Sequence, residues 1–192
     1  MFNMVVFGPP GCGKGTQAAK IVEKYGFLHV STGDIIRRQI SKGTAMGQLL
    51  EKFTARGLLV PDSIILKEIW RFALQHQYEK GIIFDGFPRN LYQAQMLDRI
   101  FHKKEMRISL VVSIDVHEEE LMRRVLERGK TSGRIDDNAE VMHNRLLVYF
   151  SQTQPVIEYY RKNKRLESVH GILPVEQVAT CIDTAIQKRL SI

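Results

Sequence analysis

Short apolar runs alternate with longer amphipathic stretches along the whole chain. Five of the apolar runs have the length and composition of β-strands: Asn3–Phe7, Leu28–Ser31, Ile82–Asp85, Leu110–Asp115 and Arg165–Val169. Such alternation is typical of a parallel sheet with helices on both faces. The pattern therefore predicts an α/β fold with a five-stranded parallel sheet flanked by helices.

Apolar residues at helical spacing predict helices between and after these strands. One opens at Gly13 and one lies near the C-terminus; their expected buried faces are Ala18, Ile21, Val22 and Tyr25 in the first, and Val175, Val178, Ile182 and Ile186 in the second. Another helix should start at about Asn138, with Asp137 and Glu140 as a capping box. Because proline lacks an N–H, Pro155 should interrupt that helix, and a second helix could begin there.

Two segments do not fit the alternation of strand and helix. The stretch Thr32–Asp62 has helix-like material without an apolar strand, and Arg128–Asn138 is polar and punctuated by glycine. We expect both to be peripheral mobile pieces of one domain. The domain would span residues 1–192, with a core of 1–31, 63–127 and 139–192, a helical insert at about 32–62 and a short lid at about 128–138.

The composition indicates a soluble globular protein. Hydrophobic residues make up 44% of the 192 residues and charged residues 26%. No apolar run reaches the ~18 residues that a transmembrane helix needs, and no secretory leader is evident. Two cysteines, Cys12 and Cys181, form neither a disulfide framework nor a zinc cluster. We therefore expect a cytoplasmic protein without membrane contact and without zinc.

The formal net charge of +7 and the pI of about 9.5 indicate an anionic partner. Nucleic acid and small phosphorylated metabolites both qualify. The basic residues are dispersed and mostly lie beside acids, as in "EEELMRRVLER", rather than in the dense patches usual for nucleic-acid binding. The motifs must decide between the two.

The stretch "GPPGCGKGT" between the first strand and the first helix has the form of a phosphate-binding loop. Its glycines would let backbone N–H groups converge on phosphate oxygens at a helix N-terminus, and Lys14 would reach the β- and γ-phosphates. Gly15 stands where the general motif has a Ser or Thr that holds Mg²⁺. Another residue must supply that function.

Asp85 is the candidate for it. In "GIIFDGFPR" it ends a buried strand, and open α/β sheets bind ligands beyond the carboxyl ends of their strands. Its carboxylate could hold Mg²⁺ directly or through water, while Thr16 contacts phosphate or a metal-bound water. The alternative is that Asp85 only caps the following turn.

Four motifs together resemble the nucleoside monophosphate kinases, and most closely the adenylate kinase family: "GPPGCGKGTQ", "STGDIIR", "DGFPRNLYQA" and "ERGKTSGRIDDN". They span nearly the whole chain in the expected order. The resemblance implies a P-loop NTPase fold with a monophosphate-binding insert and a lid. It also implies a monomer that transfers the γ-phosphoryl of ATP to AMP, forming ADP, with Mg²⁺. The short lid has no room for the longer insert of many bacterial adenylate kinases, which sometimes carries four cysteines for zinc.

The resemblance also implies the site residues. The ATP phosphates would be held by Gly11, Cys12, Gly13, Lys14, Gly15 and Thr16, with Leu173 near the adenine. The AMP pocket would comprise Thr32, Arg37, Leu58, Leu59, Val60, Gly86, Phe87, Pro88, Arg89 and Gln93. Around the transferring phosphoryl would lie Arg89, Arg124, Arg128, Arg134 and Arg145, with Asp136 anchoring them.

Arginine suits this chemistry because it is always charged and grips oxygens in a fork. Arg124 could instead pair with Glu120, four residues earlier. Cys12 could be a redox switch, but a small residue filling a tight turn explains it more simply, and His29 is interpreted as a packing residue.

Two positions favour AMP as the acceptor. The family's UMP/CMP kinases usually have "SAGD" where this chain has "STGD", and Asn where it has Gln93. An amide can pair with the adenine edge; the alternative is that Gln93 is an exposed helix residue. The alternatives are a UMP/CMP kinase and a P-loop regulatory GTPase or nucleotide-dependent binding module. Guanine-reading switches need an Asn-Lys-x-Asp element, and the candidate "NKRL" at Asn163 lacks the Asp. Nucleic-acid binding rests on net charge alone.

Overall fold

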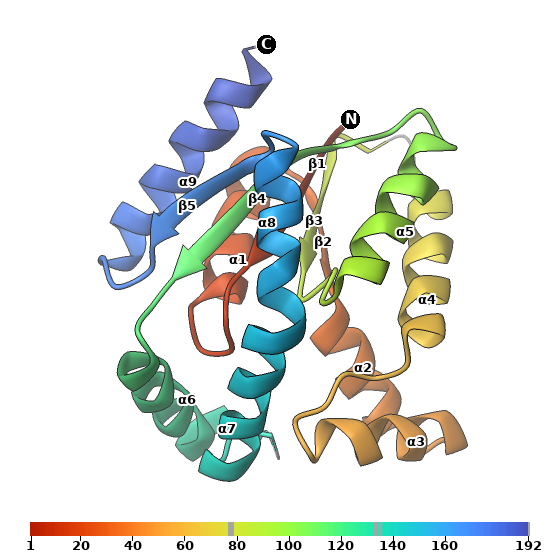
Figure 1. Ribbon diagram of the computed structural model, residues 1–192, viewed down its shortest axis with the longest axis vertical. Coiled ribbons are helices and arrows are strands. Elements are labelled where there is room, and N and C mark those ends of the chain that lie inside the picture. Colours follow the sequence, from red (N-terminus) through yellow and green to blue (C-terminus); the bar gives the residue numbers. More distant parts are fainter. Residues whose placement is uncertain (77–78, 133, 135, 192) are drawn as a thin grey trace.

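One sheet of five parallel strands forms the centre of the molecule (Figure 1), which is described here by a computed structural model covering residues 1–76, 79–132, 134 and 136–191. Its strand order is β2-β3-β1-β4-β5. The strands are β1 Phe2–Phe7, β2 Leu28–Ser31, β3 Gly81–Asp85, β4 Ile108–Asp115 and β5 Leu166–His170. The predicted sheet is confirmed, with each strand end within one or two residues of its expected place.

Helices cover both faces of this sheet and extend beyond its strand tips. The α-helices of the described residues are α1 Lys14–Tyr25, α2 Thr32–Ser41, α3 Ala45–Thr54, α4 Asp62–Gln75, α5 Leu91–His102, α6 Glu118–Ser132, α7 Ala139–Val148, α8 Gln154–Lys162 and α9 Val175–Leu190. Alternate residues of β1 point to opposite faces: Val5 and Phe7 pack with α4, α5 and α8, whereas Met4 and Val6 pack with α1, α6 and α9. Every residue of β1 is buried, and all except Asn3 are apolar, so the strand does not alternate between apolar and polar positions. Asn3 Nδ2 donates to the Arg107 carbonyl at 3.0 Å.

The apolar faces predicted for the first and last helices are largely confirmed. Ala18 and Ile21 of α1 are buried, and Val22 and Tyr25 pack against the same cluster. In α9, Val178, Ile182 and Ile186 are buried, but Val175 is 46% exposed. The prediction for Val175 is wrong because it is the first residue of α9 and lies beside the cavity at the phosphate loop rather than over the sheet.

The predicted helix from Asn138 begins at Ala139, but the expected capping box is wrong. Asn138 is the cap, and its side chain accepts the Val141 N–H, while the Asp137 carboxylate binds an arginine instead. The interruption near Pro155 is confirmed. A π-helical segment, η1 Tyr149–Thr153, separates α7 from α8, whose first turn contains Pro155.

The two segments that broke the strand–helix alternation lie near the carboxyl ends of the strands. Residues 32–54 form α2 and α3, which pack against each other, and α6 runs through Ser132 into the second segment. Figure 1 places α2, α3, α6 and α7 together beyond the tips of the strands. The predicted lid includes Gly133 and Ile135, which lie outside the described residues. Within the described chain, no helix is long and apolar enough to span a membrane.

Candidate functional site

The loop between β1 and α1 is folded tightly around its glycines. Gly8 has φ of 147°, and a Cβ there would lie 2.8 Å from the carbonyl oxygen of Ile114. Gly13 is the N-cap of α1 in the left-handed conformation, and no side chain caps the helix. The first N–H groups of α1 are therefore free to bind an anion, which the positive end of the helix dipole also favours.

Lys14 folds over this loop. Its Nζ donates to the carbonyl oxygens of Gly8 at 2.8 Å and Pro9 at 2.9 Å, and lies 3.6 Å from Cys12 Sγ. Burial raises the pKa of the Cys12 thiol, although the Lys14 charge opposes that shift. A buried thiol with a raised pKa is a poor nucleophile. This favours Cys12 as the small residue of a tight turn.

Asp85 ends β3 at the mouth of the loop, directly opposite Val6 of β1. Its Oδ2 lies 3.4 Å from His29 Nε2. Burial pushes the pKa of Asp85 upward, but the His29 side chain and the Lys14 charge outweigh it and hold that pKa below its usual value. His29, interpreted from the sequence as a packing residue, thus lies in the site beside Asp85, with 27% of its side chain exposed.

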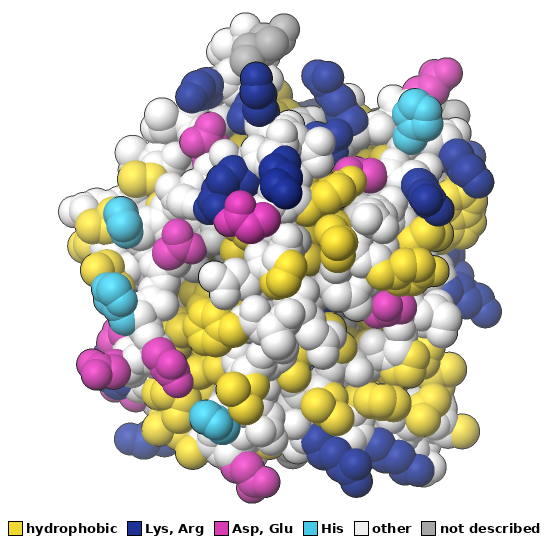
Figure 2. Space-filling model, viewed as in Figure 1, with side chains coloured by type: hydrophobic (Ala, Val, Ile, Leu, Met, Phe, Trp, Pro, Cys, Tyr) yellow, Lys and Arg dark blue, Asp and Glu magenta, His cyan; other side chains and the backbone are white. Residues whose placement is uncertain are grey.

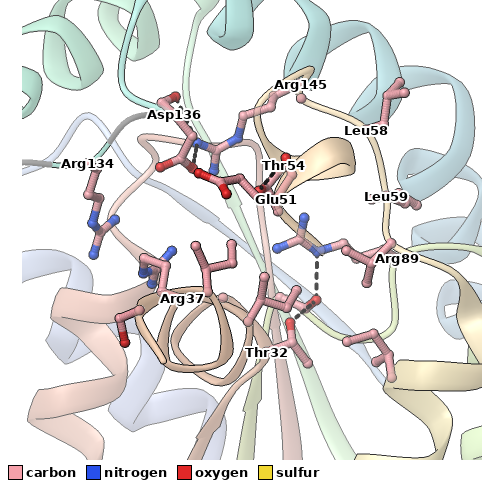
Figure 3. A pocket seen from close by; sticks show the side chains of 18 of the residues that line it. Thr32, Arg37, Glu51, Thr54, Leu58, Leu59, Arg89, Arg134, Asp136 and Arg145 are labelled. Carbon is pink, nitrogen blue, oxygen red and sulfur yellow. Dashed lines mark hydrogen bonds and ion pairs between the residues drawn. The ribbon is translucent and has the colours of Figure 1, made fainter. Parts of the chain in front are cut away.

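The described residues enclose two adjoining cavities at this edge of the sheet. The α2–α3 cavity has a volume of about 450 Å³ and is bounded by α2, α3, the Leu58–Val60 segment and the end of β3 (Figure 3). The phosphate-loop cavity is larger, about 740 Å³, and is bounded by Gly11–Gln17, Asp85, α6 and the start of α9. Four arginines line both cavities: Arg37, Arg89, Arg134 and Arg145.

These four arginines come from four separate segments, which are α2, the loop after β3, the segment after α6, and α7, and they converge on the boundary between the cavities (Figure 3). Arg37 Nη2 pairs with Asp34 at 2.5 Å, Arg89 Nε donates to the Gly86 carbonyl at 2.7 Å, and Arg145 Nη1 pairs with Asp136 at 2.8 Å. The contact between Arg145 and Asp136 agrees with the anchoring role expected for Asp136.

Burial opposes the charge of three of these arginines, although some of them have carboxylate partners. Burial, together with the charges of Arg145 and Arg37, lowers the pKa of Arg89 to about 10. Burial likewise lowers the pKa values of Arg134 and Arg145, and Arg37 contributes in both cases. A lowered pKa means that the protein disfavours the charged form. An anion bound among these side chains would remove that penalty.

Arg124 and Arg128 of α6 line the phosphate-loop cavity from its other side. Arg124 Nε donates to Glu120 at 2.7 Å, the pairing considered from the sequence, and its Nη2 donates to the Gly171 carbonyl at 3.0 Å. Arg128 grips Asp137 with two hydrogen bonds of 2.6 and 2.7 Å. The side chain of Asp137 is fully buried, so Arg128 ties the end of α6 to the start of α7.

Thr32 and Gln93, two residues expected from the sequence in the monophosphate pocket, are buried at the α2–α3 cavity. Thr32 is 2% exposed and its hydroxyl donates to the Gly86 carbonyl at 2.7 Å. Gln93 is also 2% exposed and lines the cavity, which excludes the alternative of an exposed helix residue. Leu58, Leu59 and Val60 line the same cavity.

Three further candidates lie in other surroundings. Phe87 lines neither of these cavities and packs near Phe84 in the core, whereas Pro88 and Leu173 line the phosphate-loop cavity. Within the described residues, no group of three or more His, Cys, Asp or Glu side chains is placed to hold a metal ion. A cation here would have to be held by one carboxylate together with ligand oxygens and water.

Comparison with known proteins agrees with this geometry. A sequence model of the family "Adenylate kinase" matches residues 6–165. The chain belongs to the adenylate kinase family. It is 42% identical over 188 residues to an adenylate kinase of Phocaeicola vulgatus, covering 98% of this chain and 100% of that protein. It is 43% identical over 178 residues to one from Bacteroides fragilis, covering 93% and 94%, and 38% identical over 188 residues to one from Porphyromonas gingivalis, covering 98% and 97%.

In this member of the adenylate kinase family, sequence reasoning missed two acidic residues at the site. Asp137 was assigned to a helix cap, and Asp62 was not singled out, yet its carboxylate holds Asn90 and Gln93 beside the α2–α3 cavity. The adjacent aspartates at 136–137 were the only sequence signal for Asp137. No local sequence feature marks Asp62, because its partners lie about thirty residues away along the chain.

Proposed function

We propose that the protein catalyses the reversible transfer of the γ-phosphoryl group of ATP to AMP, giving two molecules of ADP. The observation that carries this proposal is the pair of adjoining cavities with four arginines on their common boundary. One cavity has the phosphate loop and the other the buried amide of Gln93. Two phosphorylated ligands that occupied both would meet at the arginines.

ATP would occupy the phosphate-loop cavity. The N–H groups from Gly11 to Thr16 would bind its phosphates, and Lys14 would exchange its bonds to the loop carbonyls for phosphate oxygens. By resemblance to the family, Leu173 would lie near the adenine. Arg124 and Arg128 would contact the phosphates from α6. Eight Lys and Arg side chains against three carboxylates line this cavity, which supports a polyanionic ligand.

AMP would occupy the α2–α3 cavity. Its phosphate would lie at Arg37 and Arg89, and its base would lie toward Thr32, the Leu58–Val60 segment and Gln93. Its phosphate oxygen, already an anion, would attack the γ-phosphorus, so no general base is required. Catalysis would consist of positioning and of neutralising charge on the transferred group by Arg89, Arg134 and Arg145, without a covalent protein intermediate.

Mg²⁺ fits the residues at the phosphate loop. The Asp85 carboxylate is ionised and faces the cavity, and a Cβ on Gly15 would lie 3.9 Å from its Oδ2, so Gly15 leaves space beside it. One carboxylate, water and phosphate oxygens are the usual ligands of Mg²⁺ at nucleotide sites. Asp85 would hold the cation, directly or through water, with Thr16 close by. When bound, the cation would neutralise charge on the phosphate oxygens.

We further propose that α2–α3 acts as a closing insert and that the end of α6, with Arg134, acts as a short lid. Closure over both ligands would keep water from the activated phosphoryl group. Many of the cationic side chains line the cavities, so the net positive charge of the chain would serve to bind nucleotides rather than nucleic acid. We expect a cytoplasmic monomer, and the two free cysteines are compatible with a reducing compartment.

A coupled assay of ADP formation tests the proposal. The protein is mixed with ATP, Mg²⁺ and one of AMP, CMP, UMP or GMP. We expect rapid ADP formation with AMP and rates at least tenfold lower with the other monophosphates, since a single mismatched polar contact to a base costs about that much. Comparable rates with CMP or UMP would make the protein a pyrimidine monophosphate kinase, and no transfer at all would refute the kinase assignment.

The same assay tests the role of Asp85. Titration of Mg²⁺ with Asp85→Ala should require a higher Mg²⁺ concentration for half-maximal rate than the unmodified protein. An Asp98→Ala variant is the matched control, because Asp98 pairs with Arg165 and Tyr159 away from the cavities. A Mg²⁺ titration that Asp85→Ala leaves unchanged would show that Asp85 has no part in holding the cation.

A further inference from the structure

The side-chain amide of Gln93 is held from two sides. Its Oε1 accepts the backbone N–H of Arg89 at 2.7 Å, and its Nε2 donates to Asp62 Oδ1 at 2.7 Å. Asp62 is the first residue of α4, whereas Gln93 lies in the first turn of α5. The same carboxylate accepts from Asn90 Nδ2 at 3.0 and 3.2 Å.

These contacts set which end of the amide is oxygen. An ionised carboxylate only accepts hydrogen bonds, and a backbone N–H only donates. If the amide were turned over, Oε1 would face the Asp62 carboxylate and Nε2 would face the Arg89 N–H. Both contacts would become repulsive, and two buried polar groups would lose their partners. Asp62 and the Arg89 backbone therefore impose the same orientation.

The fixed amide retains part of its hydrogen-bonding capacity. A primary amide has two N–H groups and two carbonyl lone pairs. Asp62 uses one N–H and Arg89 uses one lone pair, so one donor and one acceptor remain, each at a known end. Gln93 lines the α2–α3 cavity. A ligand in the cavity therefore meets the remaining N–H donor and the remaining carbonyl acceptor at fixed positions, which cannot be exchanged.

Adenine and hypoxanthine differ in the order of hydrogen-bond donor and acceptor along one edge of the base. At the Watson–Crick edge, adenine presents a ring nitrogen that accepts and an exocyclic amine that donates, whereas hypoxanthine, of nearly the same shape, presents a ring N–H that donates and an oxygen that accepts. An amide free to turn over could pair with either base. An amide held in one orientation pairs with only one of them in a given pose.

We propose that Asp62 is a specificity-determining positioning residue, which locks the Gln93 amide in the orientation that accepts adenine and rejects 6-oxopurines. The proposal rests on the proposed function, in which AMP occupies the α2–α3 cavity. Asp62 itself lines neither of the two cavities, so it acts through Gln93. The bond from the Arg89 N–H to Gln93 also links base recognition to the backbone of an arginine that would hold the phosphate.

The test compares kcat/KM for AMP and for IMP at saturating ATP and Mg²⁺. Asp62→Asn keeps the shape of the side chain, but its amide can present either a donor or an acceptor to Gln93. We expect the ratio of kcat/KM for AMP to that for IMP to fall about tenfold, the change expected from a hydrogen bond to a charged group. Asp62→Glu keeps an acceptor-only group and should restore most of the ratio.

Asp98→Asn makes the same chemical change on α5 away from the cavities, at a carboxylate that pairs with Arg165 and Tyr159, and should leave the ratio unchanged. If Asp62→Asn fails to fold, the ratio is measured with Asp62→Ser, whose hydroxyl can also donate or accept. An unchanged ratio in a folded Asp62 variant, including equal losses for both acceptors, would overturn the positioning role. Failure of the unmodified protein to phosphorylate AMP would instead overturn the proposed function.

Discussion

Arg89 combines a firmly held backbone with a buried side chain whose charge is disfavoured, and under the proposed function that charge would bind phosphate. Its backbone is held from two sides, because Thr153 Oγ1 donates to its carbonyl and its N–H donates to Gln93. Its guanidinium has a pKa lowered to about 10 by burial and by neighbouring arginines. Hydrogen bonds thus fix the backbone of Arg89, whereas the charge of its side chain is disfavoured in the absence of a bound anion.

Replacement of Arg89 by Met should separate activity from stability. We expect kcat/KM for phosphoryl transfer to fall at least a hundredfold, because the substitution removes a cation that would bind phosphate under the proposed function. The free energy of unfolding should stay the same or rise by about 1–3 kcal/mol, since the cost of holding that charge disappears. Enzyme kinetics and urea denaturation measure the two effects. Arg99→Met on the exposed side of α5 is the control for both, and strong destabilisation by Arg89→Met would make the position structural.

At the scale of elements, the pair of Arg128 and Asp137 joins the end of α6 to the start of α7. The Asp137 carboxylate accepts two hydrogen bonds from Arg128 and one from Ser132. Burial pushes the pKa of Asp137 upward, but the hydrogen bonds from Arg128 outweigh it and keep that pKa below its usual value. The two helices therefore depend on an ionised Asp137 for their connection.

Asp137→Asn should destabilise the protein in a pH-dependent way. A carboxylate whose pKa is lowered on folding stabilises the protein above its unfolded pKa and loses that effect as the pH falls through its folded pKa. We expect a loss of about 2 kcal/mol at pH 7 that shrinks as the pH falls below about 4. Urea denaturation at several pH values measures it.

Glu127→Gln, which alters only an exposed pair with Arg123, should change the stability by less than about 0.5 kcal/mol at any pH. A loss in Asp137→Asn that stayed constant between pH 7 and pH 3 would show that the ion pair is not its source.

The same scale shows what one sequence can predict. The strands and the phosphate loop were found because their signals are local: an apolar run, a glycine spacing, a lysine at a helix start. The order β2-β3-β1-β4-β5 could not be read, because strand pairing joins residues such as Phe2 and Gly81 that carry no local mark of each other. Asp137 was misassigned for a related reason, since an aspartate before a helix suits a cap and an ion pair equally well.

For the molecule as a whole, charge is distributed unevenly. Figure 2 shows Lys and Arg side chains interspersed with acids over the face it presents, whereas the phosphate-loop cavity collects eight cationic side chains and three carboxylates. Concentration of like charge in a cavity destabilises the empty protein and attracts anions. The effect belongs to no single residue, because the contributing side chains come from five or more separate elements.

Inorganic triphosphate should therefore stabilise the protein strongly. At a hundred times its Kd, a ligand that binds only the folded state adds about 2.7 kcal/mol to the free energy of unfolding. We expect a clear rise in Tm with triphosphate at low ionic strength and a smaller rise in high salt, because salt screens the interaction. Thermal denaturation followed by fluorescence measures it. A rise in Tm that did not depend on salt, or that persisted fully in Lys14→Ala, would contradict binding at this cavity.

The convergence of Arg37, Arg89, Arg134 and Arg145 has a consequence for the life of the protein in a cell. Arg37 and Arg145 pair with carboxylates, but burial still lowers the pKa values of Arg89, Arg134 and Arg145. Under the proposed function, the phosphates of bound nucleotides would offset that cost, and the nucleotides would act as removable parts of the folded structure. The amount of intact protein should then follow the supply of adenine nucleotides: starvation would empty the cavities, increase the unfolded fraction and expose the chain to proteases. Under the proposed function, degradation of the enzyme would in this way depend on the same nucleotides that it interconverts.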